Sequence, residues 1–152
     1  MLTTTPDRAV STLDISKDIV IAAPLAVAFE ALLEELGPEG QIPDGRPFPM
    51  KIEPWPGGRW YRDLGNNTGH FWGHVQVIKP PTLLEISGPL FMSYPAISHV
   101  QYRLTADGDG TRLTLVHRAL GQITPEHREG VATGWAHGLG RIRDIAERKA
   151  RR

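Results

Sequence analysis

Hydrophobic residues recur at two different spacings along the chain, and each spacing indicates one kind of element. Between residues 13 and 21 apolar side chains occupy alternate positions, the pattern of a strand with one buried face. Between residues 25 and 36 they recur every three or four positions, on one face of a helix. Pro24 suits the first turn of that helix, and Gly37 with Pro38 ends it. The chain therefore predicts a strand followed by a helix.

Short apolar segments separated by turn residues fill the middle of the chain. Short connections of this kind join antiparallel neighbours, and the sequence from Asp107 to Gly110 is typical of a hairpin. Strands are expected near 50–55 and over 59–64, 70–78, 83–87, 97–105 and 111–118.

A long second helix is expected after these strands. Thr124 can cap it, Pro125 fits its first turn, and the helix should run to about Arg148. Its apolar stripe consists of Val131, Trp135, Leu139, Ile142 and Ala146. A curved antiparallel sheet of about six or seven strands wrapped around this helix is the simplest way to bury the stripe. We expect an α+β protein with one domain over residues 13–150, preceded by a disordered tail over residues 1–12.

Composition narrows the chemistry that the chain can perform. The 152 residues contain no cysteine, which excludes disulfides, zinc ribbons, iron–sulfur clusters and thiol nucleophiles. Seventeen basic and seventeen acidic residues cancel, whereas a general nucleic-acid binder has a strong basic excess. The chain has no apolar run long enough for a membrane span, and its first residues lack the features of a signal peptide. A cytoplasmic protein without a nucleic-acid partner is expected.

Four segments, taken in order, resemble one known family. They are Trp-Pro-Gly-Gly-Arg-Trp at 55–60, Gly-His-Val at 73–75 with Lys-Pro-Pro at 79–81, residues 110–117, and Gly134-Trp135 with Leu139. Over about residues 13–148 the chain is similar to the activator-of-heat-shock-ATPase-homologue-like (AHSA-type) family of the START-like, polyketide-cyclase-like (SRPBCC) superfamily. The resemblance implies a helix-grip fold with a cavity between the sheet and the C-terminal helix. In relatives this cavity binds lipids, hormones, polyketides or other apolar molecules, and a few relatives are enzymes.

Six prolines lie between Gly37 and Gly58, which excludes a regular helix in that segment. Family members commonly have a short second helix here. Because this chain departs from that pattern, the resemblance does not define the shape of the cavity mouth. Residues 38–56 are expected to form a long ordered loop. Such a loop either covers a binding site or merely crosses the surface, and the sequence does not choose between these alternatives.

Strand alternation assigns side chains to the two faces of the sheet. Tyr102 and His117 share their face with four apolar residues of the predicted hairpin, so this face should point inward. The same reasoning turns Trp60, Arg62 and Phe71 inward and Trp72 outward. The expected cavity-lining residues are Trp60, Arg62, Phe71, Tyr102, His117 and Trp135.

The polar members of this set allow more than one function. Arg62, Tyr102 and His117 could satisfy one another or solvent at the cavity rim, or could orient the polar atoms of an apolar ligand. Binding of a small apolar molecule without a cofactor is the first expectation. In an alternative, His117 and Tyr102 act as acid and base of a cyclase- or isomerase-type enzyme, because histidine titrates near neutral pH. His70 and His74 lie on an outward face without a carboxylate or cysteine to complete a metal site.

A protein-interaction domain is the third possible class. Phe91, Met92 and Tyr94 could form an exposed apolar patch for a chaperone or a second copy of the chain, or could fold over the cavity as a gate. In the last helix Gly134 and Gly138 flank the apolar stripe, where they allow a close approach to the sheet or leave room for a ligand. If they leave room, replacing Gly138 with Leu should reduce ligand capacity more than stability.

Overall fold

The sheet is antiparallel throughout and contains seven strands in the order β1-β7-β6-β5-β4-β3-β2. The computed structural model describes residues 9–152. The strands are β1 (Ser11–Ile21), β2 (Lys51–Ile52), β3 (Arg59–Gly65), β4 (Thr68–Lys79), β5 (Leu83–Gly88), β6 (Ala96–Asp107) and β7 (Gly110–Gly121). The helices are α1 (Leu25–Glu35) and α2 (Pro125–Ala150). The predicted α+β class and the helix-grip architecture are confirmed.

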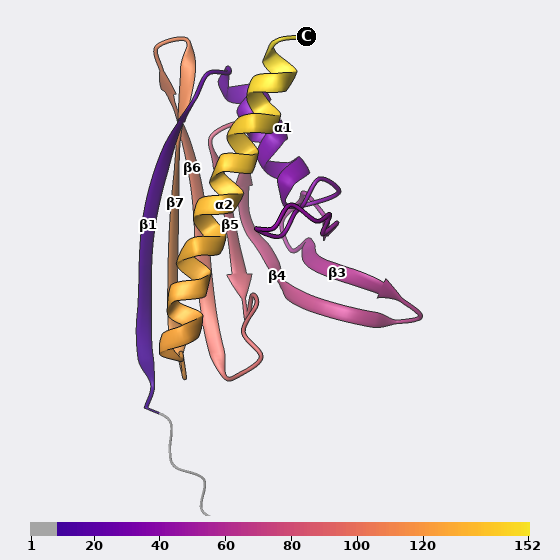
Figure 1. Ribbon diagram of the computed structural model, residues 1–152, viewed down its shortest axis with the longest axis vertical. Helices are drawn as coiled ribbons and strands as arrows, with labels where there is room; N and C mark the ends of the chain where they lie inside the picture. Colours follow the sequence, from indigo (N-terminus) through magenta and orange to yellow (C-terminus); the bar gives the residue numbers. More distant parts are fainter. Residues whose placement is uncertain (1–8) are drawn as a thin grey trace, which may run out of the picture.

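The long helix α2 lies along one face of the sheet, and α1 lies beside its C-terminal half (Figure 1). The sequence signals at its start act as expected, because Thr124 Oγ1 accepts a hydrogen bond of 3.2 Å from the backbone N–H of His127. The side chains that α2 buries are Val131, Trp135, Leu139, Ile142, Ile145 and Ala146. Neither helix of residues 9–152 is long and apolar enough to cross a membrane.

The connection from β1 to β2 carries the chain from one edge of the sheet to the other, by way of α1 and the segment 36–50. This segment contains no regular helix, and it is held by backbone hydrogen bonds from Phe48 to Gly40 and from Met50 to Gly37, both 2.8 Å long. The expected ordered loop is therefore present. The expected strand near 50–55 is reduced to the two residues of β2.

The N-terminal boundary differs from the expected one. The strand β1 begins at Ser11, so residues 11 and 12 of the expected tail pair with Gly121 and Leu120 of β7. The prediction for residues 1–8 lies outside the described residues.

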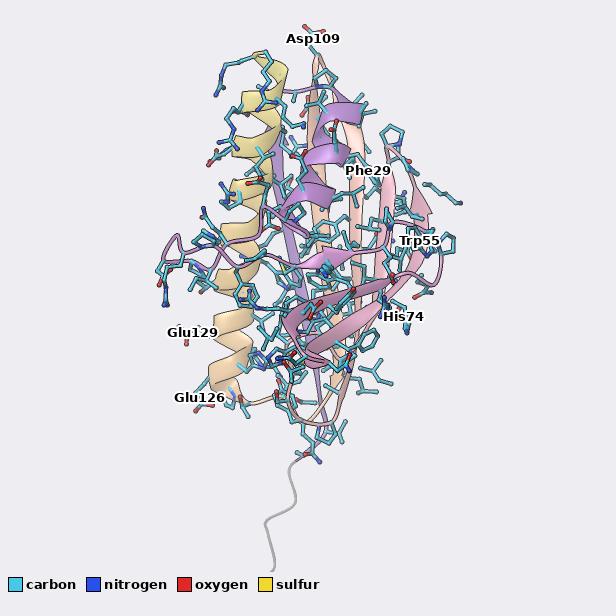
Figure 2. The ribbon with its side chains drawn as sticks, turned by 90° about the vertical axis from the view of Figure 1, so that its right-hand side faces the viewer. Phe29, Trp55, His74, Asp109, Glu126 and Glu129 are labelled. Atoms are coloured by element: carbon cyan, nitrogen blue, oxygen red, sulfur yellow. The ribbon has the colours of Figure 1, made fainter. Side chains whose placement is uncertain are left out.

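The hairpin of β6 and β7 has the faces that alternation predicts. Tyr102 and His117 are buried together with Val100, Leu104, Leu113 and Leu115. Asp109 lies at the tip of this hairpin, away from the core (Figure 2). The predicted faces are correct because the register is unbroken: the two strands pair residue by residue from Ala96↔Gly121 to Asp107↔Gly110.

The inward orientation predicted for Phe71 is wrong, and so is the outward one for Trp72. Phe71 is 45% exposed, whereas Trp72 is only 5% exposed. The cause is an irregular register between β3 and β4: Trp60 pairs with Gly73, but the next residue, Tyr61, pairs with Phe71. Trp72 is thus an extra residue, a β-bulge, and the bulge reverses the faces of the residues that precede it in β4.

Candidate functional site

A pocket of about 320 Å³ opens between α2, the end of α1, β3 and the loops 36–50 and 88–95. Its walls are mostly apolar, and the large side chains among them are Phe48, Met50, Trp60, Phe91, Val131 and Trp135. Four polar side chains also reach it, those of Glu35, Gln41, His127 and His137. A cavity lined by apolar groups with a few polar ones is the usual form of a small-molecule site.

Aromatic contacts hold the mouth of the pocket together. The ring of Phe91 lies 5.6 Å from that of Trp60, 5.4 Å from that of Trp72 and 5.7 Å from that of Trp135. The indole N–H of Trp60 donates a 2.8 Å hydrogen bond to the backbone oxygen of Leu36, which fixes the end of α1 against β3. Phe91 therefore lines the pocket and packs on three indole rings, while 39% of its surface stays exposed.

Glycines form the wall that α2 gives to the pocket. Gly130, Gly134 and Gly138 follow one another at helical spacing, and all three line it. A Cβ atom added at Gly130 or Gly134 would meet nothing within 4 Å, and one at Gly138 would lie 3.7 Å from Glu35 Oε2. Close packing therefore does not require glycine at these positions, and the missing side chains leave space in the pocket.

Sequence reasoning missed all four polar side chains of the pocket, and Glu35 is the acid among them and the most deeply buried. It is the last residue of α1 and only 6% exposed, and no hydrogen bond among the described residues reaches its carboxyl oxygens. Burial raises the pKa of Glu35 to about 8, although the positive charge of Arg141 acts in the opposite direction. The carboxyl is therefore mainly protonated at neutral pH. A sequence signal existed, because Ala28, Leu32 and Glu35 share one helical face.

His117 lies in a buried network behind Trp135. The indole N–H of Trp135 donates to His117 Nδ1 at 2.9 Å, so this nitrogen must be unprotonated. The proton of the neutral ring is then on Nε2, 3.0 Å from Ser98 Oγ, which accepts it. Burial lowers the pKa of His117 to about 4, which keeps the ring neutral. The network joins β6, β7 and α2 and positions Trp135 in the pocket wall.

The predicted site residues are distributed over three places. Trp60 and Trp135 line the pocket, whereas Tyr102 and His117 are buried and are not among its lining residues. The guanidinium of Arg62 lies 3.7 Å from the ring centre of Phe48, and Arg62 and Phe71 line a separate cleft along the β3–β4 hairpin.

Arg62, Tyr102 and His117 do not satisfy one another directly in the described residues. No hydrogen bond in residues 9–152 joins any two of these side chains: Arg62 Nη1 donates to the backbone oxygen of Pro49 at 3.4 Å, whereas His117 is bonded to Trp135 and Ser98.

The two histidines of β4 that were considered as metal ligands do not share one face of the sheet, contrary to the prediction from alternation, because the bulge at Trp72 lies between them. His74 lies on the side of the sheet away from α2, near Trp55 (Figure 2), and its Nδ1 is 3.0 Å from the backbone oxygen of Gly57. His70 precedes the bulge, so its side chain lies on the face opposite to that of His74, and it is exposed on the β3–β4 hairpin. Within residues 9–152, no three histidine or acidic side chains gather in a group that could hold a metal ion.

A curved antiparallel sheet that wraps a C-terminal helix and leaves a pocket beside it defines a START-like, helix-grip protein. The chain belongs to the Activator of Hsp90 ATPase homolog 1-like protein family, whose sequence pattern matches residues 46–147. No curated protein matches the sequence.

Several solved structures share the fold at low sequence identity. An uncharacterized protein from Rhizobium leguminosarum is 15% identical, with a TM-score of 0.74 over 94% of this chain and 99% of that one. CalU16 from Micromonospora echinospora is 22% identical, with a TM-score of 0.62 over 94% and 87% of the two chains. StfQ, a di-domain ARO/CYC protein of the steffimycin biosynthetic pathway, is 14% identical, with a TM-score of 0.65. The match covers 93% of this chain and 52% of StfQ.

Proposed function

We propose that this protein binds a small, largely apolar molecule in the pocket between the sheet and α2. The observation that carries the proposal is the pocket itself, a space of about 320 Å³ with walls that include Phe48, Trp60 and Trp135. This volume lies at the lower end of the range of roughly 300–1,000 Å³ that is usual for ligand sites. A compact molecule of one or two rings fits such a space better than a long-chain lipid.

The glycines of α2 support a function for this space. Glycine in a helix interior costs up to about 1 kcal/mol relative to alanine. Gly130 and Gly134 have room for a side chain, so packing does not explain this cost. A requirement for open volume on the pocket side of α2 does explain it.

Titration with a neutral fluorescent probe, N-phenyl-1-naphthylamine, tests the proposal. The emission of the probe should rise and saturate at one molecule per chain. Gly134→Leu should weaken binding at least about tenfold, because four heavy atoms would enter the pocket. Gly140→Leu is the matched control, since Gly140 lies in the same helix with open space around it but does not line the pocket.

Native mass spectrometry of the freshly purified protein gives an independent measurement. A retained small molecule, displaced by the probe, would name the chemical class of the ligand. Absence of saturable probe binding, or equal weakening by both leucine variants, would contradict the proposed function.

A further inference from the structure

We propose that the ligand of this pocket is a neutral apolar molecule with a carbonyl oxygen, and that protonated Glu35 donates a hydrogen bond to that oxygen. The inference rests on the proposed function and deepens it, because it names the polar group of the ligand and the residue that recognises it.

Glu35 lies where its carboxyl group can meet a ligand in the pocket. The side chain lines the pocket where the end of α1 meets α2, and it is only 6% exposed. On the α2 side it faces Gly138, which has no side chain to offer a hydrogen bond. No hydrogen bond among residues 9–152 reaches either oxygen. The carboxyl oxygens have no protein partner but are not completely enclosed, so a ligand in the pocket can reach them and supply a hydrogen bond.

The charged and titratable groups around Glu35 determine its protonation. On α2, Arg141 favours the ionised carboxylate, but it donates its own hydrogen bond of 3.0 Å to the backbone oxygen of Glu39. On β6, burial raises the pKa of Tyr102, and the nearby negative charge of Glu35 raises the pKa of Tyr102 further. His127 and His137 line the same pocket on α2.

Burial outweighs the effect of Arg141, and the end of α1, the negative end of the helix dipole, also disfavours a carboxylate. At neutral pH the pocket therefore contains a carboxylic O–H group.

The protonated state selects the class of ligand. A carboxylic O–H is a strong hydrogen-bond donor, and the oxygen of a ketone, aldehyde, ester or quinone is its natural acceptor. An ammonium group would require the ionised carboxylate and would lie near the positive charge of Arg141. A carbonyl compound needs neither a change of protonation nor a second charge in the pocket.

A pair of matched probes tests this inference directly. The first probe is 6-propionyl-2-(dimethylamino)naphthalene, which carries one ketone, and the second is its 6-propyl analogue, in which CH₂ replaces the carbonyl group. Their dissociation constants are measured by fluorescence titration at pH 6.5 and pH 9 with the wild type, Glu35→Gln and Glu35→Leu. Circular dichroism at both pH values establishes that each protein is folded.

The wild type should bind the ketone about five- to tenfold more tightly than the propyl analogue at pH 6.5. The preference should vanish at pH 9, because a carboxylate accepts hydrogen bonds but cannot donate them. Glu35→Gln should keep the preference at both pH values, since its amide N–H donates and does not titrate. Glu35→Leu should bind the two probes equally at both pH values.

Four results would overturn the inference. Equal binding of the two probes to the wild type at pH 6.5 would do so while leaving the proposed function intact. A ketone preference of the wild type that persists or grows at pH 9, or a preference that survives in Glu35→Leu, would assign the recognition to another group. Binding of neither probe would overturn the proposed function together with this inference. If the leucine variant does not fold, the pH series of the wild type and the glutamine variant still decides.

Discussion

Glu35 shows how a single buried residue opposes folding when its charge has no partner. In the unfolded chain its pKa lies near 4.5, and in the folded protein burial raises it to about 8. Between these values the folded state retains a proton that the unfolded state releases, so the stability contributed by this group falls as pH rises. Above pH 8 the loss is complete.

We expect Glu35→Gln to be more stable than the wild type, and the difference to grow with pH. Each pH unit between about 4.5 and 8 adds at most about 1.4 kcal/mol, because one proton is involved. Urea denaturation of the ligand-free proteins at pH 5 and pH 8 measures the difference. Glu129→Gln is the control, since Glu129 lies on the exposed side of α2 (Figure 2). A stability difference independent of pH would show that the Glu35 carboxyl is already ionised at pH 5.

At the scale of the element, α2 combines a buried stripe with a row of missing side chains. The stripe packs on the sheet, and the row, from Gly130 to Gly138, faces the pocket. A side chain at any of these three positions would therefore stabilise the helix but reduce the volume of the pocket.

Gly134→Ala and Gly140→Ala distinguish the effect on helix stability from the effect on pocket volume. Both added methyl groups have open space around them, so each variant should gain up to about 1 kcal/mol in the free energy of unfolding. Only Gly134→Ala places its methyl group in the pocket, and it should bind N-phenyl-1-naphthylamine more weakly than Gly140→Ala does. Denaturation and probe titration on the same two samples measure both effects. Equal probe affinities would contradict the placement of Gly134 in the binding surface.

The faces of the strands and the start of α2 show which features of the elements could be predicted from the sequence. Period-two alternation gave the correct faces of β6 and β7, because their register is unbroken. Alternation failed at Phe71, since one extra residue in β4 reverses the faces and no residue type marks a bulge in advance. Capping residues gave the start of α2 correctly.

The candidate site was only partly predictable for a related reason. Trp60 and Trp135 could be found, because both lie on apolar faces of regular elements. The hydrogen bonds of His117 depend on Trp135, which is distant in sequence, and this pairing exists only after the sheet closes around α2. Glu35 could have been found on the helical face of Ala28 and Leu32, but whether that face meets a core or a pocket is a property of the tertiary structure.

At the scale of the whole molecule, Glu35 and His117 act on stability in opposite directions. The pKa of His117 falls from 6.5 to about 4 on folding, so its contribution is fully present above pH 6.5 and is lost as pH falls toward 4. Glu35 contributes most at low pH and loses its contribution as pH rises toward 8. The other acidic groups with a resolved shift, such as Glu53 and Asp63, have lowered pKa values and act below this window.

The stability of the wild type should therefore be nearly level between about pH 4.5 and 6.5 and should fall between about pH 6.5 and 8. In His117→Gln the opposing slope is absent, so stability should fall from about pH 4.5 onward. Urea denaturation at half-unit intervals of pH measures both profiles, with His70→Gln on the exposed hairpin as the control. Parallel profiles for His117→Gln and the wild type would mean that His117 titrates equally in the folded and unfolded states.

The two tryptophans in the pocket wall make occupancy an optical property of the native chain. Trp60 and Trp135 are two of the four tryptophans, so a bound chromophore that absorbs their emission lies within efficient energy-transfer distance of both. The glycine row, which lies on the same helix as Trp135, can be altered one side chain at a time without replacing any residue of the buried stripe. Tryptophan fluorescence would therefore report binding in the proposed site without an added label. Variants at the three glycine positions would differ in pocket volume, and together they would form a set of sensors for ligands of different size.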